Sequence, residues 1–447
     1  MRIVILGAGY AGVTLARRLE SMLPPDVDLV VVDESETHLV KHEVHRVIRR
    51  PSVADAIQVP LSELFERARV RTDRVTGLDR EARTVHLADG DDLDYDYAAV
   101  CLGSVTANYG IPGVAEHGLP LLSVEDAIEI RTAFLSAAGI DADADSDDEA
   151  QIVVEDADGD RPSGRDHSDT QDIVAPDAVD AESSETPQAD VRGAHVDAES
   201  SETPQADVRG AHVDAVVGGA GLSGVQTAGE LAALAREEGV AADVTLIEQM
   251  DDVAPNFPAN FRQAVRSELE SRDVTVSTDT TVERATPGAV ETDQGTFDAD
   301  VFVWTGGITG TGAMGGERPM VRDDLRLNER TFVVGDAARA VDADGEPVPA
   351  SASAAIREAG TVATNLVRLV EHGRSNDGGF TPRLDPYRFE VPGWIVTVGD
   401  GTVAQLGPEV VTGSPARAMK AAVGAGHLSS VGAIRNAVDL AESELRG

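Results

Sequence analysis

The sequence predicts an α/β fold with two Rossmann-like units in one chain and a small α+β region at the C-terminal end. Glycines at the spacing G-x-G-x-x-G occur twice, at residues 7–12 and 219–224, each time between an apolar strand and a helical segment. In both units the next strand ends on an acid, about twenty residues after the last glycine. Because the whole order of strand, turn, helix, strand and acid recurs, we expect two nucleotide-binding units.

The first unit begins at the N-terminus. β-branched residues at positions 3–5 predict a strand, and residues 13–20 predict a helix. Each glycine between them has a physical purpose. Gly7 makes the tight turn, Gly9 lets the backbone approach a pyrophosphate, and Gly12 lets the helix pack closely on the strand. We expect the phosphates at the unpaired N–H groups and the positive dipole end of this helix.

The acid of the first unit is Asp33, placed where a carboxylate can accept hydrogen bonds from an adenosine ribose. Lys41 and His42 follow it closely, so we expect them either to contact the same cofactor or to begin a solvated helix. Val75, in the next strand-like stretch, is also assigned to the cofactor site. Gly103 ends a later apolar strand, where a glycine lets the backbone pass against a flat ligand.

The second unit opens with the strand-like residues 213–217. Gly219, Gly221 and Gly224 then repeat the spacing of the first motif and lead into a helix. The following strand ends on Glu248. Its negative charge repels a 2′-phosphate and therefore favours NADH over NADPH.

Two later strand ends complete the pattern. One closes on Gly306 and Gly307, which leave room for a dinucleotide, and the other closes on Gly335 and Asp336. A carboxylate at a strand end beside a helix N-terminus can hold a chain of hydroxyl groups. The same residue can also cap the helix that follows.

Composition limits the function classes. The chain has 79 acidic residues against 37 lysines and arginines, a net charge of −42. Molar salt shortens the Debye length to ~3 Å and screens such repulsion, so we infer a salt-loving source organism. No basic patch or aromatic platform favours nucleic acid as a partner.

The side chains that usually hold metals or redox disulfides are scarce. Cys101 is the only cysteine and lies in an apolar run, so we expect a core thiol and neither a disulfide nor a redox pair. The ten histidines lack metal-ligand spacing, so no metal site is expected. No apolar stretch reaches the ~18 residues of a spanning helix and no signal peptide precedes the first strand, which predicts a cytoplasmic protein.

Residues 140–212 differ from the rest, being rich in acidic and small residues without any aromatic side chain. Residues 180–196 recur without change as 197–213. Such a segment cannot bury enough apolar surface to order itself, so we expect an acidic disordered insertion. We divide the chain into a first nucleotide domain in two parts (1–122 and 308–372), a connecting helix (123–139), the insertion (140–212), a second nucleotide domain (213–307) and a C-terminal region (373–447).

Taken in order, these motifs resemble the two-dinucleotide flavoproteins of the pyridine nucleotide-disulfide oxidoreductase superfamily. In that pattern the first unit binds FAD, the inserted second unit binds NAD(P)H, and the late Gly-Asp pair contacts the ribityl chain of the flavin. The resemblance therefore implies an FAD domain with an NAD(P)H domain inserted in it, and FAD and NADH as cofactors.

Within this superfamily the absence of a cysteine pair argues against disulfide reductases and sulfide:quinone oxidoreductases. The chain is similar to the type II NADH dehydrogenases, whose helix after the second motif resembles residues 225–231. Glu230 falls on the acid that this family places near the nicotinamide and the flavin. Ser353 and Arg357 occupy the two glutamine positions of the family's Ala-Gln…Gln signature, so the chain departs from that family at the quinone-lining positions. We take Glu230, Ser353 and Arg357 as the candidate catalytic residues.

The C-terminal region predicts a hairpin, with strands at 394–399 and 402–406 joined by Asp400-Gly401. A helical pattern of apolar residues follows, at Leu428, Val431, Ile434, Val438, Ala441 and Leu445. In the resembling family this region lies on the membrane and opens a quinone tunnel. The stripe is equally compatible with a core or homodimer interface, and its polar face is acidic, unlike a basic membrane binder.

The resemblance implies an enzyme that passes hydride from NADH to FAD and electrons on to a quinone. One alternative is a soluble flavoenzyme whose acceptor is ferredoxin, rubredoxin or oxygen. A second is a non-catalytic redox sensor that binds NADH and FAD and signals through the acidic insertion. The expected location is the cytoplasm, either free or peripheral on the inner face of the cell membrane.

Overall fold

The computed structural model describes residues 1–141, 212–375, 380–391 and 393–446. Apart from its ends, the predicted acidic insertion with its tandem repeat lies outside the described residues. The α/β fold with two parallel sheets is confirmed, and each sheet carries one of the two glycine motifs.

The first sheet has five parallel strands in the order β19-β9-β1-β2-β5. Ile5 in β1 pairs with Val31 on one side and Ala99 on the other, and all three side chains are fully buried. Such burial on both faces explains the continuous apolar runs. The strands are β1 (Arg2–Leu6), β2 (Asp28–Asp33), β5 (Arg69–Thr72), β9 (Tyr97–Val100) and β19 (Thr331–Val333).

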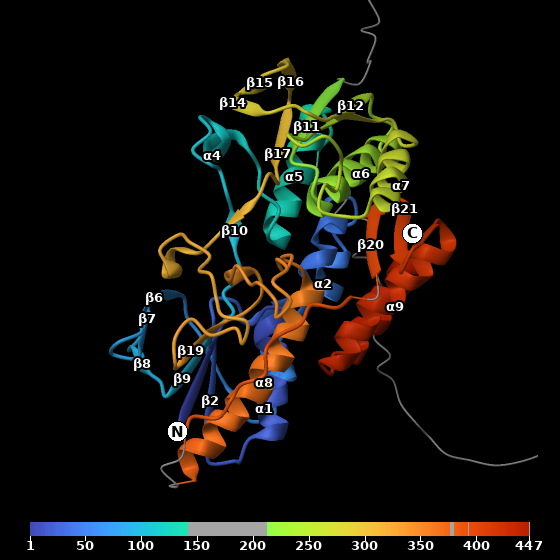
Figure 1. Ribbon diagram of the computed structural model, residues 1–447. Helices are drawn as coiled ribbons and strands as arrows, with labels where there is room; N and C mark the ends of the chain where they lie inside the picture. The colour runs from blue at the N-terminus through green and yellow to red at the C-terminus, as the bar shows by residue number, and fades with distance from the viewer. Residues whose placement is uncertain (142–211, 376–379, 392, 447) are drawn as a thin grey trace, which may run out of the picture. The chain divides into compact units, whose positions relative to one another are not determined.

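Two helices that are distant in sequence pack together beside this sheet. They are α1 (Tyr10–Met22) and α8 (Ala352–Arg374), which lie side by side in Figure 1. The helix α1 follows the first glycine turn directly, and α8 follows the strand β19 and the turn after it. The C-terminal part of the chain thus completes the unit that the N-terminus begins.

The second sheet has four parallel strands in the order β13-β12-β11-β17. Val217 in β11 pairs with Leu246 and Val303, and all three side chains are fully buried. The elements of this unit are β11 (Val213–Gly218), α6 (Leu222–Glu237), β12 (Ala242–Ile247), α7 (Ala259–Glu270), β13 (Val274–Ser277) and β17 (Val301–Trp304).

Two short strands, β10 (Val105–Thr106) and β18 (Ile308–Thr309), form an antiparallel pair. In Figure 1, β10 lies between the sheet with β11 and β17 and the sheet with β9 and β19. The chain therefore passes between the two units along a hydrogen-bonded ribbon.

The remaining elements before the C-terminal region are smaller. In the first unit they are β3 (Thr37–Leu39), η1 (Lys41–Ile48), α2 (Val53–Ile57), β4 (Gln58–Pro60), α3 (Leu61–Leu64), β6 (Val75–Asp79), β7 (Thr84–Leu87) and β8 (Leu93–Asp94). Further along the chain they are α4 (Val114–His117), α5 (Val124–Ala137), β14 (Val282–Thr286), β15 (Gly288–Thr292), β16 (Gly295–Ala299), η3 (Gly312–Met314) and η4 (Gly335–Ala337).

The predicted C-terminal hairpin is confirmed, with Val398 paired to Gly401 across the turn. A third strand, which the sequence analysis missed, extends it. The elements are β20 (Gly393–Val398), β21 (Gly401–Leu406), β22 (Glu409–Thr412), α9 (Ser414–Ser430) and α10 (Ile434–Arg446).

The predicted apolar stripe of this region is wrong beyond Val431. Leu428 and Val431 are buried, but Ile434 and Val438 are 67% and 51% exposed. The helix breaks at Gly432, whose φ of +88° ends α9, and α10 restarts with a different face inward. Among the α10 residues whose side chains the structure describes, Ala437 and Leu440 are the buried apolar ones.

Candidate functional site

The first glycine turn has the geometry that the motif predicts. Gly7 has a φ of +98°, which favours glycine. A Cβ atom on Gly12 would overlap the carbonyl oxygen of Gly7, so the helix can lie this close only without a side chain. A Cβ on Gly9 would meet nothing within 4 Å, so that face of the backbone is open for a ligand.

The second glycine turn repeats this geometry. Gly219 has a φ of +95°, and a Cβ on Gly224 would overlap the Gly219 carbonyl oxygen. The space beside Gly221 is open within 4 Å, as it is at Gly9.

Both motif helices begin without a side-chain cap. Gly9 precedes α1 and Gly221 precedes α6, and neither supplies a hydrogen-bond acceptor to the first turn. By contrast, Ser123 caps α5 and Ser351 caps α8. The open N–H groups and dipole ends of α1 and α6 therefore fit two pyrophosphates.

The acids after the second strands brace these turns. The Asp33 carboxylate accepts hydrogen bonds from the backbone N–H of Ala8 at 2.5 Å and of Ser35 at 2.8 Å. Burial raises the pKa of Asp33, and these two hydrogen bonds lower it. An ionised carboxylate has about four acceptor sites, so it can still take a ribose hydroxyl.

Glu248 repeats this arrangement in the second unit. It accepts from the N–H of Ala220 at 2.7 Å and of Met250 at 3.0 Å. The sequence analysis assigned Asp33 to ribose binding and Glu248 to discrimination against a 2′-phosphate, and the structure adds this turn-bracing role for both acids.

Lys41 and His42 begin the helical turn η1, and the choice between cofactor contact and a solvated helix start stays open. Lys41 is partly buried; burial lowers the pKa of its ammonium group, whereas nearby Asp336 and Asp126 raise it. The imidazole of His42 hydrogen-bonds the Tyr10 hydroxyl through Nδ1. Lys41 therefore lies within electrostatic reach of the Gly-Asp turn of the same unit.

Gly103 and Val75 differ in what surrounds them. Gly103 has a φ of +67°, and a Cβ atom added to it would meet nothing within 4 Å, so the backbone there can pass against a ligand. Val75 is buried where β6 begins and pairs with Leu87 of β7. Its cofactor role stays a prediction.

The late Gly-Asp turn is held by two charged side chains. The N–H of Gly335 donates to the Glu358 carboxylate at 2.5 Å, and Glu358 is 1% exposed. Arg318 donates to the carbonyl oxygens of Asp336 at 2.6 Å and Ala338 at 2.7 Å. Burial raises the pKa of Glu358 to about 7, with the hydrogen bond from Gly335 opposing it.

Glu230 lies in an ion pair between elements. Its carboxylate is 2.7 Å from Nε of Arg49, and both side chains are buried. The same guanidinium also bonds Glu237 of α6 and Asp400 of the β20–β21 turn. Burial raises the pKa of Glu230 to about 7, whereas Arg49 and Lys420 lower it.

Gln226 lies one helical turn nearer the second glycine motif than Glu230. Its amide is 3.2 Å from Nε2 of His45 and 3.3 Å from the Thr397 hydroxyl. Gln226 thus joins α6 to η1 and β20 through its amide, and a role of Glu230 at the nicotinamide stays a prediction.

Ser353 and Arg357 lie together on the first turns of α8. Nε of Arg357 donates to the Ser353 hydroxyl at 3.4 Å, and the arginine is exposed. The next residue, Glu358, points inward to Gly335. One helix therefore presents an exposed cation and a buried carboxyl group in adjacent positions.

Gly306 and Gly307 are needed for different reasons. A Cβ on Gly306 would overlap the Trp304 ring, whose indole N–H donates to the Ala107 carbonyl at 2.8 Å. A Cβ on Gly307 would overlap the hydroxyl of Tyr109. The tight approach at Gly306 thus serves packing, whereas Gly307 leaves room for a movable side chain.

A cluster of aromatic side chains joins the first glycine motif to α9. His38 is fully buried, with Nδ1 2.9 Å from the Ala8 carbonyl oxygen and Nε2 3.1 Å from Nε2 of His427. Because a carbonyl can only accept, His38 donates through Nδ1 and the second bond must be donated by His427. The ring of Tyr10 lies 4.7 Å from that of His427, centroid to centroid.

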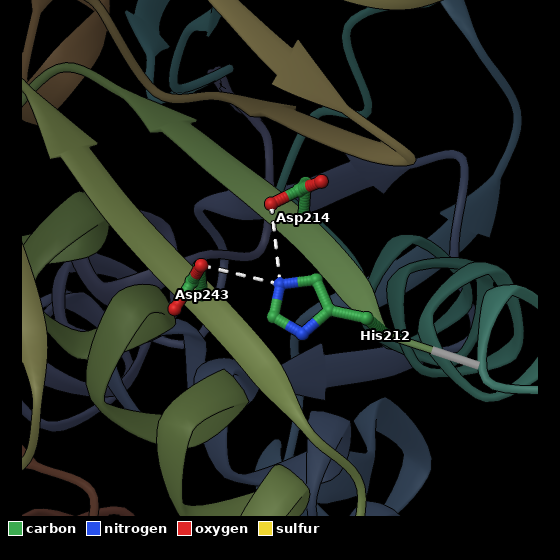
Figure 2. A group of neighbouring side chains, drawn as sticks. All are labelled: His212, Asp214 and Asp243. Carbon is green, nitrogen blue, oxygen red and sulfur yellow. Dashed lines mark hydrogen bonds and ion pairs between the residues drawn. The ribbon is translucent and has the colours of Figure 1, made fainter. Parts of the chain in front are cut away.

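Figure 2 shows a separate group of His212, Asp214 and Asp243 at the start of β11 and β12. Nε2 of His212 is 3.5 Å from Asp214 and 3.2 Å from Asp243. The histidine and Asp243 are exposed, and Asp214 is half-buried. The group lies at the opposite strand ends from the glycine turn, so we treat it as surface ion pairs.

The sequence analysis missed Tyr10, Arg49, Tyr109 and Glu358. A signal exists for Glu358, because it interrupts the small apolar face of a helix that is otherwise buried there. The other three owe their place to contacts between distant segments, which no local pattern reports.

Comparison with known proteins agrees with this geometry. The family model described as pyridine nucleotide-disulphide oxidoreductase matches residues 1–154 and 168–359. A type II NADH:quinone oxidoreductase of Staphylococcus aureus is 23% identical over 449 residues, covering 94% of this chain and 92% of that protein.

Two solved structures have a similar fold. The structure of NDH2 from Plasmodium falciparum in complex with NADH has a TM-score of 0.71 at 12% identity, covering 98% of this chain and 97% of that one. The sulfide:quinone oxidoreductase of Aquifex aeolicus has a TM-score of 0.67 at 15% identity, covering 97% and 92%.

Proposed function

Because the chain belongs to the pyridine nucleotide-disulphide oxidoreductase family, we propose that it is an FAD-dependent NADH dehydrogenase whose electron acceptor is a quinone. Family membership makes it a flavin-dependent oxidoreductase that uses FAD and NADH. The observation that carries the proposal is the pair of uncapped helix N-termini behind open glycines, one in each unit.

The first unit has the residues to hold FAD. Gly9 and the N-terminus of α1 would hold the pyrophosphate, Asp33 would accept from the ribose, and Asp336 would bind the ribityl chain. Gly103 gives the ring a flat approach to the backbone. When bound, FAD accepts a hydride equivalent from NADH and passes its electrons to an acceptor.

The second unit has the corresponding residues for NADH. Gly221 and the N-terminus of α6 would hold the pyrophosphate, whereas the space beside Gly307 is filled by the hydroxyl of Tyr109. Glu248 disfavours a 2′-phosphate by charge. We retain Glu230 as a residue for nicotinamide placement or proton handling, since its carboxyl group is buried and burial raises its pKa to about 7.

The quinone is the acceptor that relatives of this chain favour, since the Staphylococcus aureus protein is a NADH:quinone oxidoreductase. On this chain Ser353 and Arg357 would face the acceptor from α8. A cation there stabilises negative charge that develops as electrons arrive.

We also propose that α9 and α10 make the contact with a membrane surface. Val423, Ile434 and Val438 are large apolar side chains that these helices expose. Among the described residues, no helix combines the length and apolar character required to cross a bilayer. Binding would therefore be peripheral, and a homodimer through the same face is the alternative that light scattering would reveal.

The proposal is tested on holoprotein in molar KCl. NADH is added without oxygen, bleaching of the flavin bands near ~450 nm is followed, and a short-chain menaquinone is then supplied. We expect bleaching and then quinone-driven recovery at ~1–1000 per second. Recovery with ferredoxin or oxygen but not with quinone would replace the acceptor while leaving the flavoenzyme, and absence of a flavin spectrum would contradict the family-based assignment.

A paired variant tests the acceptor site. Changing Ser353→Gln together with Arg357→Gln is expected to change the quinone-driven recovery rate by about tenfold or more, while bleaching by NADH stays the same. The matched control is Arg368→Gln, on the same helix, whose guanidinium pairs with Asp385. Equal effects of the control and the paired variant would contradict a role of Ser353 and Arg357 at the acceptor.

A further inference from the structure

Glu358 is a buried carboxyl group without a cationic partner. Among the described residues, the acidic side chains that are only 1% exposed are Glu43, Glu230 and Glu358. Glu43 pairs with Lys420 at 2.9 Å, and Glu230 pairs with Arg49 at 2.7 Å. In the described part of the chain no cation makes an ion pair with Glu358. Because an unpaired buried charge is costly, the neutral acid is favoured at this position.

The carboxyl group of Glu358 lies against the Gly-Asp turn. It accepts the N–H of Gly335 at 2.5 Å, and Asp336 is the next residue of that turn. The preceding residue of α8, Arg357, is exposed. Glu358 therefore contacts the turn from a helix position that is adjacent to solvent-exposed residues.

Two neutral side chains lie near Glu358 on other elements. Cys101, directly after β9, and Tyr387, after α8, are both buried. Burial raises the pKa of each, and the charge of Glu358 raises it further. The Tyr387 hydroxyl is buried without a hydrogen-bond partner among the described residues. Both groups stay protonated at neutral pH, so neither changes its charge in the range in which Glu358 titrates.

The charged groups around Glu358 are few. Burial raises its pKa to about 7, and of its charged neighbours Asp336 raises that pKa and Arg318 lowers it. From α1, Ala11 approaches the turn, and Arg18 lies against α8 beyond Glu358. Glu358 is thus a group beneath the turn whose protonation responds to a new charge there.

We propose that Glu358 takes up a proton from water when the cofactor is reduced and returns it when the cofactor is reoxidised. This inference rests on the proposed function, because it takes the turn at Gly335 and Asp336 to hold FAD. Hydride transfer from NADH adds two electrons and one proton to the cofactor, and so adds one net negative charge. The proton on Glu358 offsets that charge. When an acceptor removes the two electrons, the hydride proton leaves with them and the Glu358 proton returns to water.

The size of the effect follows from electrostatics. A new unit charge near a buried acid raises its pKa by about one at an effective dielectric constant of about 20. Because the pKa of Glu358 starts at about 7, such a rise gives an uptake of about half a proton per flavin near pH 7.5. At about pH 6 the acid is already protonated, and at about pH 9.5 it is ionised in both states, so the uptake disappears at both limits.

The experiment measures the midpoint potential of the bound flavin against pH, on holoprotein in molar KCl with an electrode and a mediator. The slope gives the number of protons taken up per two electrons, and neither NADH nor a quinone is needed. We expect this number to be about 0.5 higher in the unaltered protein than in Glu358→Gln near pH 7.5, and equal in the two near pH 9.5.

Glu371→Gln is the matched control, since it makes the same change at an exposed position of the same helix and should leave the proton number unaltered. Infrared difference spectra are a second readout. On reduction at pH 7.5 a band of a protonated carboxyl group should appear in the unaltered protein and in Glu371→Gln, but not in Glu358→Gln.

Equal proton numbers in the unaltered protein and Glu358→Gln would overturn the inference while leaving the flavoenzyme. If Glu358→Gln does not fold, absence of the infrared band from the unaltered protein would overturn it. Protein that binds no flavin would contradict the proposed function itself, and the inference with it.

Discussion

The two glycine turns have nearly the same backbone but different surroundings. The first glycines have φ values of +98° and +95°, and the third glycines pack on them in the same way. Ala11 in the first motif is buried, whereas Ser223 at the corresponding position of the second is exposed. A local motif thus fixes the turn but not what covers it.

The covering of the first turn comes from distant segments. A Cβ on Gly335 would lie 3.7 Å from Cβ of Ala11, and the ring of His427 packs on Tyr10. The enclosed turn suits a cofactor that stays bound, and the open turn suits a substrate that exchanges. We therefore expect FAD to be resident and NADH to come and go.

The largest effect should separate the two turns by matched substitutions. Gly9→Val and Gly221→Val both add a side chain where the protein leaves space and the backbone is extended, so both variants should fold. We expect Gly9→Val to be purified without flavin, because its side chain occupies the pyrophosphate space. Gly221→Val should keep its yellow colour and bind NADH about 100-fold more weakly, about 2.7 kcal/mol.

Absorbance at ~450 nm and calorimetry with tetrahydro-NAD are the measurements. Loss of flavin from Gly221→Val with retention in Gly9→Val would reverse the assignment of the two units.

The next effect concerns the buried carboxyl groups of the two units. The pKa of Glu358 is raised from 4.5 to about 7, so the folded protein holds a proton that the unfolded chain releases in this range. Stability therefore falls as pH rises from 4.5 to 7, by up to about 3 kcal/mol. Glu358→Gln should remove this loss and be more stable than the unaltered protein at pH 8 but not at pH 4.5.

Glu230→Gln is the comparison in the second unit. This variant should gain less unfolding free energy at pH 8 than Glu358→Gln does. The reason is that it also removes the carboxylate that pairs with the buried guanidinium of Arg49. Urea unfolding of both variants at pH 4.5 and 8 in molar KCl checks this. Identical gains would show that the Arg49 pair contributes nothing to stability.

A smaller effect tests the covering of the first turn. His427→Ala leaves the buried Nε2 of His38 without a donor and should cost about 1–2 kcal/mol of unfolding free energy. His427→Gln keeps an N–H group at a similar distance and should recover much of it. Stability is measured by urea unfolding, and FAD retention is a second readout. Equal stability of His427→Ala and the unaltered protein would count against a contribution from this contact.

The same pair predicts a dependence on acid. Burial lowers the pKa of His38 to about 4 and of His427 to about 3, both from 6.5. Both neutral forms are favoured by the fold, so this contribution is lost as pH falls from 6.5 through 4. The free energy of unfolding of His427→Gln should fall less steeply with decreasing pH across that range. An unchanged dependence on pH would contradict the contribution of the two histidines.

The smallest effect concerns the open turn and its choice of nucleotide. Glu248→Gln removes the charge that repels a 2′-phosphate and keeps one of the two oxygens that accept the backbone N–H groups of Ala220 and Met250. We expect the ratio of NADPH to NADH affinity to rise about tenfold, about 1.4 kcal/mol. Glu270→Gln, at the exposed end of α7, is the control. An unchanged affinity ratio in both variants would show that Glu248 does not determine the choice between NADPH and NADH.

Local patterns were sufficient for much of the fold. Both parallel sheets and the hairpin at Val398 and Gly401 follow from apolar runs and turn residues that lie within one short segment. The positive φ of Gly7 and the close packing at Gly12 follow from a motif of six residues. The error at the C-terminus, where Ile434 and Val438 are exposed, arose because one glycine shifted the phase of a helical pattern.

By itself, then, the sequence determined the two nucleotide turns and the helices that begin there, because glycine conformation and strand periodicity are properties of neighbouring residues. Only the tertiary structure decided that His427 meets His38, 389 residues away, and that Tyr109 lies over Gly307. Only it showed Glu358 beneath Gly335. Such contacts depend on how separate elements pack, and packing geometry leaves no periodic signal in a single chain.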